Sequence, residues 1–180
     1  LGPCVVEACE SAPFLVPIDM GRAISLSVGG DHVCVVNARG QTYCWGRNNK
    51  AQTGLRSDDS LCASSTPCVR QATQLVDLPP VVDVAAGRDH TCALTQTGNV
   101  ICWGQNSDGQ LGTGETGNSN TPVRVVGIND ATQVSVGSSF SCALHQSGSV
   151  SCWGSDASGR LGNSAVSTST TIPVPVDGLT

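Results

Sequence analysis

The strongest constraint on this chain's fold is a threefold internal repeat marked by a Cys-Trp-Gly triplet. The triplet occurs at Cys44-Trp45-Gly46, Cys102-Trp103-Gly104 and Cys152-Trp153-Gly154. The matching residues around it define three repeat cores, at 23–54, 81–114 and 131–164. Units that recur in this way pack against their neighbours to bury a shared core. We therefore divide the chain into an N-terminal segment with a lead-in strand (1–22) and a three-repeat region (23–180).

Each unit is predicted to be a small antiparallel sheet. Apolar residues alternate along its first segment, as in Ile24, Leu26 and Val28, which is the pattern of a strand. The same alternation is expected at Val82, Val84 and Ala86 and at Thr132, Val134 and Val136. A hairpin follows, and its turn has glycine in the fourth place, at Gly40, Gly98 and Gly148.

The hairpin turn sets the register of the two strands that it joins. If Thr95 faces Asn99, then Cys92 faces Cys102 at a non-hydrogen-bonded position, where Cα atoms lie about 4.5 Å apart. A disulfide tolerates that separation. The same count pairs Cys34 with Cys44 and Cys142 with Cys152.

Ten cysteines without a histidine cluster or a C-x2-C pair indicate five disulfides rather than zinc ligands. Four remain after the hairpin pairs, which allows three pairings, and we expect the local bridges Cys4–Cys9 and Cys62–Cys68. Disulfides persist in oxidising compartments, so the expected location is extracellular or at the cell surface.

Both faces of each hairpin are apolar, since Leu94 and Val100 share one face and Ala93 and Ile101 the other. A sheet with one wet face would alternate more cleanly. Radially stacked sheets, each covered on both sides, meet this demand. The predicted fold class is all-β, built of β-propeller blades.

The residues His90-Thr91-Cys92-Ala93-Leu94, Gly98-x-Val100-x-Cys102-Trp103-Gly104 and Gly109-Gln110-Leu111-Gly112 resemble the repeats of the regulator of chromosome condensation superfamily. The likeness is greatest to the disulfide-bearing secreted variants found in bacteria, and it implies a propeller, commonly of seven blades. Only three repeats are present here, with an insertion at 55–70, and we expect 171–180 to begin a fourth unit. Either further repeats of a longer chain complete the ring, or it closes between copies, for example two copies with six blades.

Two kinds of side chain invite a functional interpretation. Asp31-His32 and Asp89-His90 suggest general base catalysis, but neighbouring residues on a strand point to opposite faces, and the third unit has Ser139-Phe140 instead. We therefore expect structural histidines there, and an exposed His145 in a turn. The repeated tryptophans could stack on sugars, but their placement favours packing between blades, so we assign Trp45, Gly46, Trp103, Gly104, Trp153 and Gly154 to the structural core of the repeats.

Metal, nucleic-acid and membrane functions are disfavoured. The loops at 48–50 and 106–109 carry oxygen donors but no repeated carboxylate ladder, so calcium is not expected. The net charge is −5 and Lys50 is the single lysine, which offers little to nucleic-acid phosphates or anionic lipid. No apolar run approaches the length of a membrane helix. We expect no catalytic residue, cofactor or metal site.

The expected function is that of a non-enzymatic extracellular module that binds a protein or a glycan through loops. The Cys62–Cys68 loop is either a recognition element or a tolerated insertion. The alternative, implied only by the resemblance, is nucleotide exchange on a small GTPase. A hydrolase that uses Asp89 and His90 is a third possibility.

Overall fold

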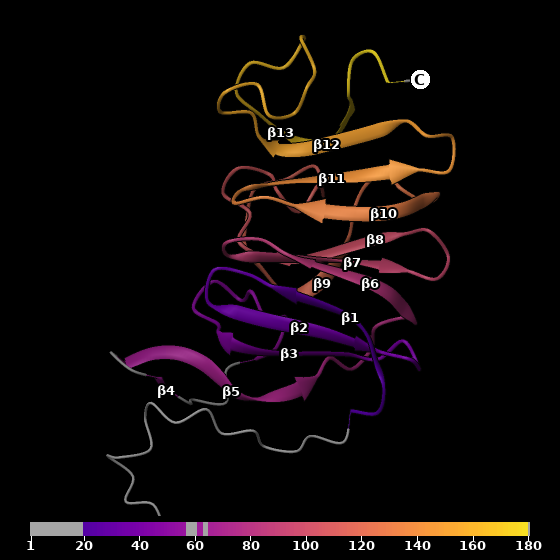
Figure 1. Cartoon of the computed structure of the whole chain (residues 1–180). Helices are drawn as coiled ribbons and strands as arrows, with labels where there is room; N and C mark the ends of the chain where they lie inside the picture. The colour runs from indigo at the N-terminus through magenta and orange to yellow at the C-terminus, as the bar shows by residue number, and fades with distance from the viewer. Residues whose placement is uncertain (1–19, 57–60, 63–64, 180) are drawn as a thin grey trace, which may run out of the picture.

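The computed structural model describes residues 20–56, 61–62 and 65–179, which form strands joined by turns and loops. Three antiparallel sheets follow one another along the chain and stack face to face (Figure 1), and we call them blades 1, 2 and 3. This confirms the all-β prediction and the division into blades. The described part of the chain has no helix long and apolar enough to cross a bilayer.

In blades 2 and 3, the four strands lie side by side in chain order. Blade 1 has the same arrangement with one additional strand, β4 (Leu61–Cys62), at its outer edge. Blade 1 has the order β1-β2-β3-β5-β4, with β1 (Ala23–Val28), β2 (His32–Asn37), β3 (Thr42–Arg47), β4 (Leu61–Cys62) and β5 (Thr66–Gln74). Blade 2 contains β6 (Val81–Ala86), β7 (His90–Thr95), β8 (Val100–Gly104) and β9 (Ser119–Arg124). Blade 3 contains β10 (Ala131–Val136), β11 (Phe140–His145), β12 (Val150–Ser155) and β13 (Ser169–Pro175).

The central hairpin of each blade has the predicted register. Cys92 lies opposite Cys102 and Leu94 opposite Val100. The Thr95 amide donates to the Asn99 carbonyl over 2.9 Å and closes the turn, in which Gly98 has a φ of 79°. Glycine fits that left-handed conformation because it has no Cβ.

The first strand of each unit departs from the predicted alternation. The register of β6 shifts between Val81 and Asp83. As a result Val81 is 1% exposed and Val82 is 41% exposed, the reverse of the expectation for Val82. A β-bulge adds one residue to a strand and turns the side chains before it to the other face. Blades 1 and 3 have the same shift.

Two predicted boundaries need correction. Residues 171–180 do not open a fourth sheet, because β13 pairs with β12 and is the outer strand of blade 3. The insertion at 55–70 is in part regular structure, since β5 begins at Thr66 and pairs with β3. In both cases the outer strand belongs to the sheet that precedes it in the chain.

The core lies between the blades, not within any one of them. Side chains from the facing sheets of blades 1 and 2 form one cluster, which includes Val36, Val84 and Trp103. A second cluster joins blades 2 and 3 and includes Val100 and Trp153. Blade 2 is therefore covered on both faces, as the apolar patterning of its hairpin indicated.

Candidate functional site

The two ends of the blades differ. At one end, which we call the loop end, lie the turns 29–31, 87–89 and 137–139 and the described parts of the loops that follow β3, β8 and β12, on the left of Figure 1. At the other end, which we call the turn end, lie the turns 38–41, 96–99 and 146–149, which join the two central strands of each blade. The loops that follow β3, β8 and β12 differ in sequence and length between blades, so a common scaffold presents three different surfaces.

Each of these loops is anchored by one buried polar side chain. The Asn106 carboxamide accepts from the Leu111 amide over 2.9 Å and donates to the Glu115 carbonyl over 2.9 Å. Asn48 makes the equivalent bonds in blade 1, and Asp156 accepts from Leu161 in blade 3. These oxygens are committed to the backbone, and the described residues contain no group of three or more His, Cys, Asp or Glu side chains placed to hold a metal.

A buried hydrogen-bond relay joins blade 1 to blade 2. The Gln52 carbonyl accepts from the Trp103 indole Nε1 over 3.0 Å and from the Thr91 hydroxyl over 2.8 Å. Because the Thr91 proton points to Gln52, the Thr91 oxygen is left to accept from His32 Nε2, 2.7 Å away. The relay thus needs a proton on His32 Nε2.

The same relay recurs between blades 2 and 3. The Gln110 carbonyl accepts from Trp153 Nε1 and from the Ser141 hydroxyl, each over 2.9 Å, and His90 Nε2 lies 2.9 Å from the Ser141 oxygen. Burial lowers the pKa of His32 to about 4 and that of His90 to about 3. Both rings are therefore neutral at pH 7, and the relay assigns the single ring proton to Nε2.

The sequence predicts part of this relay and misses the rest. His32 and His90 are structural, and the Asp89 carboxylate bonds to Gln52 (3.3 Å) and lies 3.5 Å from Arg88, with no bond to His90. That arrangement gives no support to a hydrolase built on Asp89 and His90. The missed partners, Thr91 and Ser141, carry a sequence signal. Each hydroxyl residue directly follows the position that is equivalent, in the next unit, to the histidine it contacts.

Two of the three repeated tryptophans lie at the blade junctions. Trp103 and Trp153 are fully buried between blades, so neither offers a ring face to a sugar. Trp45 is only half-buried, on the face of blade 1 that looks away from blade 2. The glycines that follow have φ near 100°. A Cβ on Gly46, Gly104 or Gly154 would lie 2.5–2.7 Å from a backbone oxygen in the turn that precedes the neighbouring strand of the same blade.

His145 is not the exposed turn residue that the sequence suggested. It ends β11, its side chain is 12% exposed, and its Nδ1 lies 2.6 Å from Asp130 Oδ1. Its Nε2 lies 3.0 Å from the Ser151 hydroxyl. The strand pairing brings Asp130 there, since Ala131 is the partner of His145 across β10 and β11.

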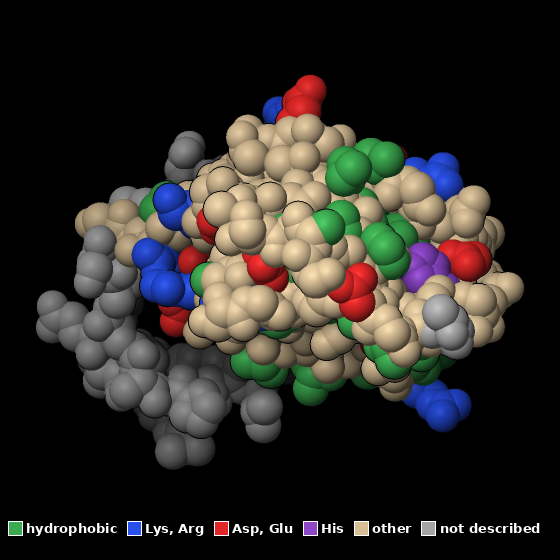
Figure 2. Space-filling model, turned by 90° about the horizontal axis from the view of Figure 1, so that it is seen from above, with side chains coloured by type: hydrophobic (Ala, Val, Ile, Leu, Met, Phe, Trp, Pro, Cys, Tyr) green, Lys and Arg blue, Asp and Glu red, His purple; other side chains and the backbone are tan. Residues whose placement is uncertain are grey.

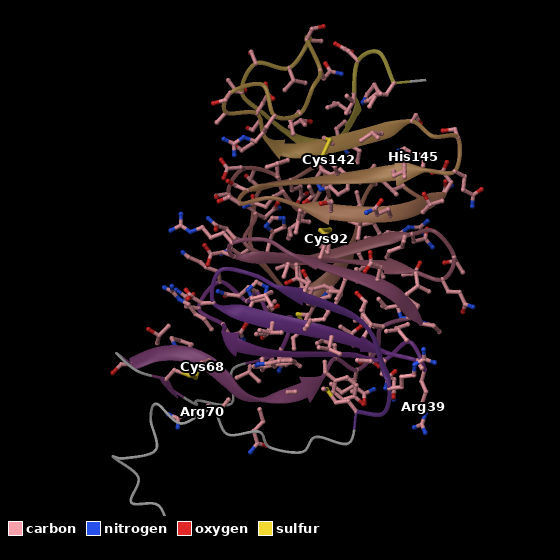
Figure 3. All side chains as sticks on the ribbon, viewed as in Figure 1. Arg39, Cys68, Arg70, Cys92, Cys142 and His145 are labelled. Carbon is pink, nitrogen blue, oxygen red and sulfur yellow. A yellow bond between two sulfur atoms is a disulfide. The ribbon has the colours of Figure 1, made fainter. Side chains whose placement is uncertain are left out.

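Four disulfides staple the blades. Cys34–Cys44, Cys92–Cys102 and Cys142–Cys152 join β2 to β3, β7 to β8 and β11 to β12, with Cα separations of 4.1–4.2 Å. Cys62–Cys68 closes the short β4–β5 hairpin of blade 1 (Figure 3). These are the pairs that the hairpin register and local bridging predict. Cys4 and Cys9 lie outside the described residues, so their expected bridge stays a prediction.

Charged side chains gather at the loop end of blades 1 and 2. Arg47 pairs with Asp31 over 3.1 Å, and Arg88, whose side chain is 75% exposed, lies beside Asp89. Figure 2 shows Lys and Arg side chains interspersed with acidic ones at the same edge of the molecule. A hollow of about 190 Å³ lies here, lined by Asn48, Ala51, Leu55, Arg56 and Asn120. Pockets that engulf small molecules are larger, about 300 Å³ or more.

Curated proteins resemble about half of the chain. The X-linked retinitis pigmentosa GTPase regulator of Homo sapiens is 39% identical over 99 residues, which is 54% of this chain and 9% of that protein. The ultraviolet-B receptor UVR8 of Arabidopsis thaliana is 33% identical over 97 residues, 54% of this chain and 21% of the receptor. The chain thus spans a small part of the length of these relatives.

Solved structures share the fold over more of the chain. Human WBSCR16 superposes with a TM-score of 0.75 at 25% identity, covering 91% of this chain and 41% of that one. Yeast RCC1 (Prp20), solved with Kap60, gives a TM-score of 0.72 at 21% identity, covering 85% and 36%. Models of the regulator of chromosome condensation (RCC1) repeat match residues 23–52, 81–110 and 131–160, and residues 39–94 and 97–144. The chain therefore belongs to the regulator of chromosome condensation repeat family.

Proposed function

We propose that this chain is a non-enzymatic binding module that recognises a protein partner through its loop end. The observation that carries the proposal is the contrast between repeated, buried junctions and three dissimilar loops held side by side at one end. Binding residues commonly lie on loops that a rigid scaffold positions. This arrangement supports the proposal of a recognition surface at the loop end.

The use of the reactive side chains supports a non-enzymatic function. His32 and His90 bond to hydroxyls across the junctions, and the hydroxyls of Thr91 and Ser141 donate to backbone carbonyls. These groups are buried where a substrate has no access. Their chemistry serves the stacking of blades.

The shape and charge of the loop end favour a protein over a small ligand. Its hollow is small, at about 190 Å³. The exposed residues Lys50, Arg56 and Arg88 lie on the same end as the Arg47–Asp31 pair. Such mixed charge complements a protein surface that carries its own charged groups. The titles of related structures also name protein partners: yeast RCC1 was solved bound to Kap60, and the binding of Prp20p to Gsp1p and histones was studied.

The Cys62–Cys68 hairpin belongs to the proposed surface. Cys68 pairs with Arg47 at the end of β3, so the stapled hairpin borders the loop end of blade 1. Blades 2 and 3 have no such disulfide among their described residues. We assign this hairpin to recognition. The four disulfides of the described residues support the proposal of an oxidising, extracellular setting for the module.

Regulation of a small GTPase is the second candidate. It is favoured by one observation, the 39% identity to a protein named as a GTPase regulator. Release of labelled GDP from a panel of small GTPases tests it. Acceleration by the oxidised chain favours this candidate over the extracellular module.

The main proposal is tested by display of extracellular protein domains against the immobilised, oxidised chain. We expect binders whose affinity falls at least tenfold with Arg88→Glu, because the substitution reverses an exposed charge at the loop end. Arg39→Glu at the turn end is the matched control and leaves binding unchanged (Figure 3). Binders that respond to Arg39→Glu and not to Arg88→Glu, or none at all, contradict the proposal.

A further inference from the structure

A serine, a histidine and an aspartate of blade 3 are joined in a row by hydrogen bonds. The Ser151 hydroxyl lies 3.0 Å from His145 Nε2, and His145 Nδ1 lies 2.6 Å from Asp130 Oδ1. A carboxylate only accepts hydrogen bonds, so the Asp130 carboxylate takes the proton on Nδ1. In the neutral ring, Nε2 is then the acceptor for the proton of the Ser151 hydroxyl.

This row of side chains does not belong to the repeat. The counterparts of His145 serve their own hairpin turns: the Asn37 side chain accepts from the Gln41 amide over 3.0 Å, and the Thr95 hydroxyl accepts from the Asn99 amide over 3.0 Å. The ring nitrogens of His145 turn to Asp130 and Ser151 instead. The other two positions also differ between blades, with Tyr43 and Ile101 at the place of Ser151 and Arg22 and Pro80 at the place of Asp130.

The bonds of the Ser151 hydroxyl also differ from those of the hydroxyls in the buried relays. The Thr91 hydroxyl donates its proton to the Gln52 carbonyl and only accepts from His32. Among the described residues, no carbonyl lies within hydrogen-bond distance of the Ser151 hydroxyl, so its proton is directed to His145. The histidine of blade 3 is thus placed to receive a proton, whereas the relay histidines donate one.

Solvent reaches the row at the turn end of the junction between blades 2 and 3. Side chains alternate along a strand, so Ser151 shares the face of Trp153, which packs in the cluster that joins these two blades. The His145 side chain is 12% exposed and that of Asp130 43% (Figure 3). Ser151 is partly buried. The site therefore lies between two described blades, and a small reagent can reach it from the turn end.

Such a row activates a serine for attack on a carbonyl carbon. A neighbouring base makes a hydroxyl more nucleophilic by taking its proton as the new bond forms, and a third group keeps that base in orientation. His145 is placed as the base, and Asp130 fixes its ring through the Nδ1 bond. Ser151 is therefore arranged as a nucleophile.

The surrounding sheet limits what this nucleophile can do. β12 pairs with β11 on one side and with β13 on the other, so the backbone amides beside Ser151 are used by the strand ladders. Enzymes that turn over esters stabilise the oxyanion with free N–H donors, and loss of one such donor slows them roughly 100- to 1,000-fold. We therefore expect a reaction with acyl donors that have a good leaving group, and slow hydrolysis of the product.

We propose that Ser151 is a modification site that accepts one acyl group from an activated ester or thioester. Ser151 Oγ bonds to the carbonyl carbon, and the bond from that carbon to the leaving oxygen or sulfur breaks. The hydroxyl proton passes to His145 Nε2 and from there to the leaving group. This goes beyond the recognition proposed for the loop end, and a single transfer to the chain is compatible with a binding module that does not turn over substrate.

Acetylation of the oxidised 180-residue chain by p-nitrophenyl acetate tests the proposal. We expect one acetyl group per chain, located on Ser151 by mass spectrometry of peptides, and no label at that position in Ser151→Ala. His145→Gln and Asp130→Asn should each lower the rate roughly 100-fold or more, because they remove the base or its orientation. Ser149→Ala, in the hairpin turn that joins β11 to β12, is the matched control and leaves the rate unchanged.

The pH dependence of labelling keeps the test independent of variants that fold poorly. With His145 as the base, the rate at Ser151 rises with pH and levels off once the ring is neutral. A rate that continues to rise, as for a hydroxyl without a base, contradicts the proposal. So does label that appears on other residues and spares Ser151, or an unchanged rate in His145→Gln. Release of nitrophenol well beyond one equivalent per chain also overturns it, because the site would then be an esterase centre and not a modification site.

Discussion

Leu26 and Val84 occupy the same position in successive blades, yet Leu26 is exposed and Val84 is buried. Nothing in the strands themselves explains the difference, since both residues lie on the face with the tryptophan and both strands pair in the same register. Val84 is covered by blade 1, and no described blade covers Leu26. The comparison shows that a side chain on a sheet face of this fold is buried only where an adjacent blade covers it.

Acidification should lower the free energy of unfolding through the two junctions between blades, where His32 and His90 lie. The folded-state pKa values of His32 and His90 are lowered to about 4 and about 3, against an ordinary value of 6.5. Below pH 6.5 the unfolded chain therefore takes up protons that the folded chain does not. The free energy of unfolding falls as pH drops from 6.5 towards 3, by several kcal/mol in total.

Denaturant unfolding at a series of pH values measures this loss. His90→Gln removes one of the two groups, so the slope between pH 6.5 and 4 should be shallower than in the wild type. An unchanged slope would show that the histidines are not the cause of acid sensitivity.

The next largest effect is expected from the tryptophans, which differ in burial between the junctions and blade 1. Trp103→Ala should lower the free energy of unfolding by about 3–5 kcal/mol, because it leaves a cavity between blades 1 and 2 and takes a donor from the Gln52 carbonyl. Trp45→Ala should cost clearly less, since its side chain is only partly buried and lies on the face of blade 1 that looks away from blade 2. Equal losses in urea unfolding would contradict the contrast.

The contribution of a disulfide to the free energy of unfolding should depend on whether it lies at a junction between blades or in a peripheral hairpin. Replacing Cys92 and Cys102 together by alanine should cost about 2–4 kcal/mol, because both side chains are fully buried at a junction. The pair Cys62 and Cys68 should cost less and should be reduced first by dithiothreitol, since it closes a peripheral hairpin. Mass spectrometry of alkylated cysteines over a reduction time course gives the order.

Glycines at the junctions should be less replaceable than glycines in loops. A Cβ on Gly87 would lie 2.4 Å from the Gly137 carbonyl oxygen of blade 3 and 2.6 Å from the His90 ring, so Gly87→Ala should cost about 1–3 kcal/mol. Gly117 has open space around it, and Gly117→Ala should cost almost nothing. Melting temperatures of the two variants decide whether the blades are as closely packed as the distances indicate.

The smallest effect is expected at the surface pair of the loop end. Arg47 and Asp31 lie 3.1 Å apart, and their side chains are 41% and 63% exposed. Asp31→Asn should therefore change the free energy of unfolding by about 1 kcal/mol or less. A larger change would mean that the loop end contributes to stability and is not free to serve recognition.

Local patterns predicted the hairpins and missed what crosses between blades. The turn length placed Cys92 opposite Cys102 because a two-strand register depends only on residues near in sequence. The bulge that exposes Val82, the strand pairing that buries His145 and the relay through Thr91 all depend on neighbours beyond the hairpin. The outer strand β13 was misassigned because its sequence is equally compatible with closing one sheet or opening another.

The sequence alone determined the repeat, the sheet of each blade, the hairpin disulfides and the family, since each rests on residues that recur at fixed spacing. The tertiary structure decided which faces are buried between the described blades and that His32 and His90 are neutral members of a relay. The physical reason is that burial and desolvation arise only when one sheet lies on another. The hydroxyls of Thr91 and Ser141 contact His32 and His90 only because the stacking of blades brings each pair within 3 Å.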